Sequence, residues 1–73
     1  MKMDIRQRTC LIIKKDGEYL VGMNQVMHCL NWSTSPYDAW RTRNKEDASR
    51  VARVTGGTLY LFTPVVAQIK ELL

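Results

Sequence analysis

The most secure structural signal in the chain is RTCLIIKKDGEYLVGM, residues 8–23. Two apolar, β-branched runs flank the pair Asp16-Gly17. A type I′ turn needs positive φ at both central positions, and aspartate followed by glycine tolerates this better than most pairs. The stretch therefore predicts an antiparallel hairpin with a two-residue loop, which sets Lys15 opposite Glu18.

The predicted register gives this hairpin two apolar faces. Ile13 is expected opposite Leu20 on one face, and Cys10 opposite Met23 on the other. A hairpin with one face in water would alternate apolar and polar residues, so this sheet is expected to be covered on both sides, by its own helices or by another chain. A homodimer is therefore one of the expected assemblies.

A short helix is predicted over residues 36–42. Ser35 is a favoured capping residue, and a proline follows it at the first helical position. Residues three or four positions apart share one side of a helix, so Tyr37, Trp40 and Arg41 are expected to crowd together. Residues 24–31 lack periodicity and predict a loop that leads into a short extended segment.

A second helix is predicted between a cap at Asn44 and a stop at Gly56-Gly57. Its apolar stripe consists of small residues, which let a helix lie close to a sheet. Glu46 stands four residues before Arg50, so an ion pair between them is expected. The stripe comprises Ala48, Val51, Ala52 and Thr55.

A further strand is predicted over residues 58–62, and its two apolar faces favour a central position in the sheet. Thr63-Pro64 then repeats the signal of cap plus proline, and apolar residues recur at helical spacing up to Leu73, which predicts a C-terminal amphipathic helix. The expected architecture is one compact α+β domain over residues 1–73. It comprises an N-terminal antiparallel β-hairpin plus a further strand in a small sheet, packed with two to three short helices.

Composition points to a cytoplasmic chain without a membrane span. No apolar run approaches the roughly 18 residues that cross a bilayer, and no signal-peptide pattern opens the sequence. In that compartment Cys10 and Cys29 are expected to remain reduced thiols. The net charge of +4 is compatible with anionic partners and equally with ordinary solubility.

Catalytic and metal-ligating residues are too few to predict an enzyme. Metal binding needs three or four ligands at suitable spacing, and the chain has one histidine and two cysteines. His28 adjoins Cys29, but neighbours in an extended segment point to opposite faces and do not form a nucleophile and base pair. We therefore expect no catalytic residue, no metal and no cofactor.

The residues most suited to contact another molecule lie in the stretch 32–54, which holds both tryptophans. Arginine, lysine and aromatic residues together suit phosphate contact and base stacking, and they are also enriched in protein interfaces. The alternative interpretation is that the tryptophans belong to the core and that the cations are merely solvated. The candidate binding residues are Trp32, Tyr37, Trp40, Arg41, Arg43, Lys45, Arg50 and Arg53.

One resemblance adds a class of function. The run NWSTSPYDAW at residues 31–40, followed by EDA at 46–48, VA at 51–52 and GG at 56–57, resembles small orphan proteins encoded by phages and prophages. Such orphans mostly have no assigned activity, so the resemblance transfers no functional residue. It implies a stoichiometric inhibitor of a host enzyme or defence complex, as anti-CRISPR proteins are, at work in the host cytoplasm.

We therefore expect a non-catalytic phage-type binding protein, anti-CRISPR-like, that inhibits a host defence nucleoprotein through its basic and aromatic surface. A first alternative is a direct nucleic-acid-binding module that uses the basic stretch from Arg41 to Arg53. A second alternative is an oligomeric sponge for a small ligand, with its pocket at a subunit interface.

Overall fold

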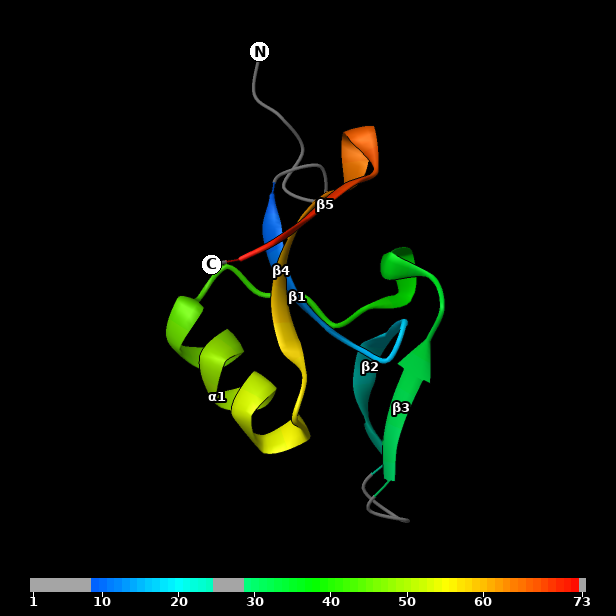
Figure 1. The fold of residues 1–73 in the computed structure, drawn as a ribbon, viewed down its shortest axis with the longest axis vertical. Coiled ribbons are helices and arrows are strands. Elements are labelled where there is room, and N and C mark those ends of the chain that lie inside the picture. The colour runs from blue at the N-terminus through cyan, green and yellow to red at the C-terminus, as the bar shows by residue number, and fades with distance from the viewer. Residues whose placement is uncertain (1–8, 25–28, 73) are drawn as a thin grey trace.

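The computed structural model describes residues 9–24 and 29–72 (Figure 1). Within these ranges it contains a five-stranded antiparallel sheet in the order β3-β2-β1-β4-β5 and one α-helix. The α+β class is confirmed, but the sheet is larger than predicted and fewer helices form. The strands are β1 (Cys10–Lys15), β2 (Glu18–Asn24), β3 (Cys29–Ser33), β4 (Thr58–Thr63) and β5 (Gln68–Glu71), and the helix is α1 (Lys45–Thr55).

The hairpin turn is confirmed. Asp16 and Gly17 have φ values of 52° and 82°, as a type I′ turn requires. Lys15 pairs with Glu18 at the turn, in the predicted register.

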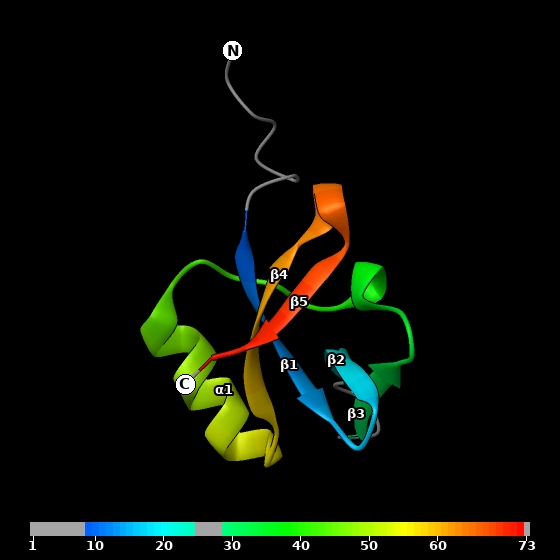
Figure 2. The same cartoon turned by 45° about the horizontal axis from the view of Figure 1, so that its top comes forward.

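The two strands of the hairpin separate beyond this turn, because another segment takes the place of the expected pairs. The Trp40 N–H donates to the Leu20 carbonyl at 2.8 Å, and Thr42 exchanges two backbone hydrogen bonds with Leu11. The chain after residue 38 therefore passes between β2 and β1 on its way to α1 (Figures 1 and 2). The predicted pairing of Cys10 with Met23 is not formed.

Helix α1 has the predicted bounds. The Asn44 side chain accepts hydrogen bonds from the backbone N–H groups of Glu46 and Asp47, and Gly56 ends the helix with a left-handed φ of 76°. The helix lies against β1 and β4 on one face of the sheet (Figure 2). Its buried residues are Ala48, Ala52 and Thr55, so the small-residue stripe is confirmed.

The first predicted helix is wrong. Only a single 3-10 turn forms, over Pro36–Asp38, although the Ser35 hydroxyl accepts a hydrogen bond from the Tyr37 N–H as a cap should. Ala39 is already extended, with φ −68° and ψ 141°. The hydrogen bonds that the following residues make with β2 and β1 override the local helical signal.

The predicted C-terminal helix is also wrong. Pro64–Val66 form a 3-10 turn, Ala67 adopts a left-handed φ of 51°, and the chain returns as β5, in which Ile69 pairs with Phe62 of β4. Thr63 makes no side-chain capping bond. The edge of β4 offers a full row of backbone partners, which local helical spacing does not reveal. Because β5 covers this edge, β4 holds the predicted central position in the sheet.

Both faces of β1 are buried, as the apolar pattern predicts. Ile12 and Ile13 are completely buried on opposite faces. Ile13 packs in a cluster with Leu20 and Ala52, on the face that α1 covers. Ile12 packs in the other cluster, which includes Phe62 and is covered by residues 36–39.

Candidate interaction surface

An open groove of about 430 Å³ lies between α1 and the β2–β3 hairpin. Buried Leu20 and half-buried Trp40 belong to its lining. Three apolar side chains at its walls are exposed, Met23 by 56%, Leu30 by 38% and Val54 by 80%. Because contiguous exposed apolar surface is uncommon on a small monomer, this groove is the strongest candidate for contact with another molecule.

A β-bulge between Leu20 and Gly22 brings Met23 to the groove. The bulge inserts one extra residue into β2, which reverses the alternation of side chains between the two faces beyond it. Met23 therefore shares the face of Leu20 and pairs with Leu30 on β3. The prediction that Met23 shares the face of Cys10 was wrong. The glycine inside the strand is the sequence signal that could have indicated the bulge.

Helix α1 forms the opposite wall of the groove. Its small buried residues hold it close to the sheet, and Val51 lies half-buried at the border of that stripe. Val54 lies outside the stripe and lines the groove from the exposed side. Arg50 stands one helical turn before Val54 and brings a positive charge to the groove.

Both tryptophans are half-buried and pack against the cluster of Ile13, Leu20 and Ala52. They therefore belong partly to the core. Trp40 also lines the groove, and its position is set by the bond from its N–H to the Leu20 carbonyl. Trp32 lies on β3, beside the tight turn that joins β1 to β2.

Tyr37 and Arg41 lie on the other side of the sheet from Trp40. The Tyr37 ring meets Phe62 edge-on, with 5.3 Å between centroids and 81° between planes, and its hydroxyl donates to the Pro64 carbonyl at 3.1 Å. Arg41 donates from Nη2 to the Tyr37 carbonyl at 2.9 Å, and its guanidinium carbon lies 5.5 Å from the centre of the Phe62 ring. The predicted cluster with Trp40 was wrong because an extended chain sends neighbouring side chains to opposite sides.

Arg43 and Lys45 line a separate hollow of about 260 Å³ beside Cys10. Burial raises the pKa of the Cys10 thiol, and the positive charges of Arg41 and Arg43 offset part of that rise. A thiol with a raised pKa is a weak nucleophile at neutral pH, so Cys10 behaves as an apolar core group.

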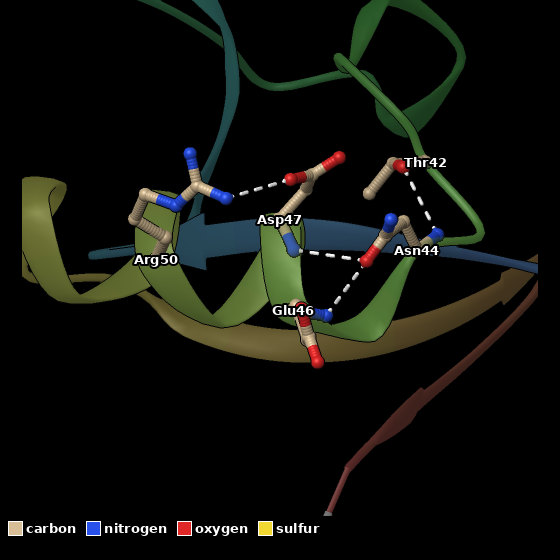
Figure 3. A network of polar contacts seen from close by, with 5 residues as sticks. All are labelled: Thr42, Asn44, Glu46, Asp47 and Arg50. Carbon is tan, nitrogen blue, oxygen red and sulfur yellow. Dashed lines mark hydrogen bonds and ion pairs between the residues drawn. The ribbon is translucent and has the colours of Figure 1, made fainter.

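The remaining cations lie on the outer face of α1. Arg50 Nη2 is 2.9 Å from the Asp47 carboxylate, so the predicted pair with Glu46 is not formed (Figure 3). Residues three apart are also neighbours on a helix, which allows this alternative. Lys45 and Arg53 share the outer face with Arg50.

The candidate binding residues therefore do not form one surface. The apolar residues that make the groove, above all Met23, Leu30 and Val54, were missed because composition does not distinguish exposed apolar residues from core residues. Trp40 and Arg50 line the groove, whereas Tyr37 and Arg41 lie at Phe62 on the other face of the sheet. Arg43 and Lys45 lie beside Cys10, and Lys45 and Arg53 lie on the outer face of α1. Trp32 lies near the turn between β1 and β2.

Residues 9–24 and 29–72 contain no group of three or more His, Cys, Asp or Glu side chains that could hold a metal ion. His28 lies outside the described residues, so its predicted loop position is untested. In the same part of the chain, no helix has the length and apolar character to cross a bilayer.

Comparison of the chain with protein-family models, curated proteins and solved structures gave no match.

Proposed function

We propose that this chain is a non-catalytic binding protein that takes up an apolar segment of a partner protein in the groove between α1 and the β2–β3 hairpin. The observation that carries the proposal is the exposure of Met23, Leu30 and Val54 around one hollow that Trp40 also lines. Burial of apolar side chains against a partner lowers the free energy by about 25 cal/mol per Å² of apolar surface removed from water.

The residues at the groove also suit a protein interface. Tryptophan and arginine are enriched among residues that dominate binding energy, and both Trp40 and Arg50 line this groove. Arg50 already shares an ion pair with Asp47 on the helix surface, where such a pair is worth roughly 1 kcal/mol or less. A partner carboxylate or phosphate can therefore compete for this guanidinium.

The partner class follows from the resemblance to small phage and prophage proteins. On that basis the chain is a stoichiometric, anti-CRISPR-like inhibitor of a host defence nucleoprotein. Its net charge of +4, Arg50 at the groove, and Lys45 and Arg53 on the outer face of α1 support a partner that carries acidic groups or nucleic acid next to an apolar segment.

The test compares Val54→Glu with Val66→Glu in pull-downs from bacterial lysate. Both valines are exposed, but Val66 lies in the 3-10 turn after β4 and does not line the groove. A carboxylate in an apolar contact weakens binding about tenfold or more, so Val54→Glu is expected to lose the partner that wild type and Val66→Glu retain. Titration of that purified partner then measures whether inhibition is complete at equimolar protein. Equal loss of the partner in both variants, or in neither, would contradict the groove as the binding site.

Direct nucleic-acid binding is a second candidate, favoured by the outer face of α1, which displays Lys45, Arg50 and Arg53. Its test is fluorescence anisotropy with labelled RNA and DNA oligonucleotides. Binding through this face should weaken steeply with added salt, and Arg53→Glu should weaken it more than Arg41→Glu, since Arg41 lies at Phe62. Absence of binding at low salt would remove this candidate.

A further inference from the structure

The two edges of the sheet, β3 and β5, differ in how they are protected. A free edge presents unpaired backbone N–H and C=O groups, and natural proteins guard such edges with charges, prolines or very short strands. β5 has four residues and carries Lys70 and Glu71. β3 reads CLNWS and contains neither a charge nor a proline. β3 therefore has the composition of an edge that accepts another strand.

The sequence of β3 is also complementary to itself. In an antiparallel pair centred on Asn31, Leu30 of one strand lies opposite Trp32 of the other, and the reverse pair forms on the far side of Asn31. Both cross-strand contacts are apolar, and no charge opposes a like charge. Leu30, exposed in the single chain, would be covered by the indole of the second copy.

We infer that two copies of this chain pair through β3, antiparallel and centred on Asn31, to form one continuous sheet. Two identical edge strands related by a two-fold axis pair antiparallel by symmetry, which agrees with the pattern around Asn31. A second copy of the chain is favoured over a foreign strand at this edge, because the sequence of β3 is complementary to itself.

The pairing has a definite consequence for the groove. A two-fold axis perpendicular to a sheet keeps equivalent faces on the same side, so the α1 helices and the grooves of both copies open in the same direction. The grooves stay open at Met23 and Val54, whereas Leu30 of each copy lies at the seam of the joined strands. The inference goes beyond the proposed function, and Val54→Glu separates them because it alters the groove and leaves the β3 edge unchanged.

The test places charges at the symmetry centre. Asn31 is exposed, so Asn31→Lys and Asn31→Glu each set two like charges opposite one another only in the paired state. Sedimentation equilibrium of the full chain, with reductant present, should show a dimer for wild type and about a tenfold or greater rise in dissociation constant for each variant. An equimolar mixture of the two variants should restore the dimer, because lysine then faces glutamate.

Gln68→Lys is the matched control, since Gln68 is also an exposed polar residue on an edge strand, but on β5. It should leave the dimer intact. A wild type that stays monomeric at every concentration, an Asn31→Lys variant that still dimerises, or a folded mixture that fails to pair would each overturn the inference. A monomeric wild type whose captured partner is lost on Asn31→Lys substitution would assign the edge to a foreign strand instead.

Discussion

Leu11 and Thr42 exchange two backbone hydrogen bonds, at 2.8 and 3.1 Å, although they lie in different halves of the chain. This bridge holds the segment that passes between β1 and β2. The same segment sends Trp40 into the cluster beneath the groove and delivers the chain to the start of α1. The Leu11–Thr42 bridge therefore connects the fold to the proposed binding surface.

Thr42→Pro should lower the free energy of unfolding by about 1 to 3 kcal/mol more than Thr42→Val. Both substitutions remove the hydroxyl that accepts a hydrogen bond from the Asn44 N–H, but only proline also removes the N–H that donates to buried Leu11. Urea unfolding of the two variants measures the difference. Equal losses would show that the bridge contributes nothing.

Gly57→Ala should destabilise the protein by about 1 to 3 kcal/mol. A Cβ at this position would overlap Cγ2 of Ile13, which is completely buried. Gly22→Ala is the matched control, because no atom beyond its own chain neighbours lies within 4 Å of the added Cβ, and its effect should stay within about 0.5 kcal/mol. Thermal and urea unfolding measure the loss of stability in both variants. A larger loss for Gly22→Ala than for Gly57→Ala would refute the close contact between Gly57 and Ile13.

Asn44→Ala should lower the free energy of unfolding by about 1 kcal/mol, whereas Asn44→Asp should be nearly neutral. The Asn44 Oδ1 atom accepts hydrogen bonds from the N–H groups of Glu46 and Asp47 at 2.9 and 3.2 Å (Figure 3). Aspartate keeps this acceptor and adds a negative charge at the positive end of the helix. Circular dichroism during urea unfolding checks both values. A loss with aspartate as large as with alanine would contradict the capping role.

The stability difference between wild type and Cys10→Ala should narrow as the pH is raised from about 7 to about 10. Burial raises the pKa of the folded Cys10 thiol, so the unfolded thiol ionises first, near its ordinary pKa of about 8.5. The contribution of the buried Cys10 thiol to the free energy of unfolding is therefore fully present below that pH. It is lost as the pH rises toward the pKa of the folded thiol.

The Arg43 charge lowers the pKa of the folded Cys10 thiol, so Arg43→Gln should raise that pKa further. The narrowing should then begin at the same pH, which the unfolded thiol sets, but continue to higher pH and become larger. Urea unfolding at a series of pH values measures both shifts. A difference between wild type and Cys10→Ala that stays constant over the whole range would contradict the effect of burial.

Local chemistry explains which predictions of structure are confirmed. The Asp16-Gly17 turn and helix α1 depend on residues a few positions apart, whose conformational preferences act within one turn or one helix. The segments after Ser35 and after Thr63 carry similar local signals, yet each forms only a single 3-10 turn. The chain then leaves the helical path, because residues 40–42 bond to β2 and β1 and residues 68–71 pair with β4. For these segments tertiary hydrogen bonding outweighed local preference.

The sequence also indicated part of the candidate site. It singled out Trp40 and Arg50, both of which line the groove. It missed Met23, Leu30 and Val54, because an apolar residue in a strand or helix is normally assigned to the core.

The hairpin turn, the bounds of α1, the central strand β4 and the burial of both faces of β1 follow from short stretches of the amino-acid sequence. Each depends on local backbone preference or on alternation along one strand. Three features depend on the folded chain as a whole: residues 40–42 separate β1 from β2, β5 replaces a helix, and a bulge turns Met23 toward α1. These outcomes depend on which distant backbone groups satisfy one another's hydrogen bonds, and that competition is settled only when the whole chain is folded.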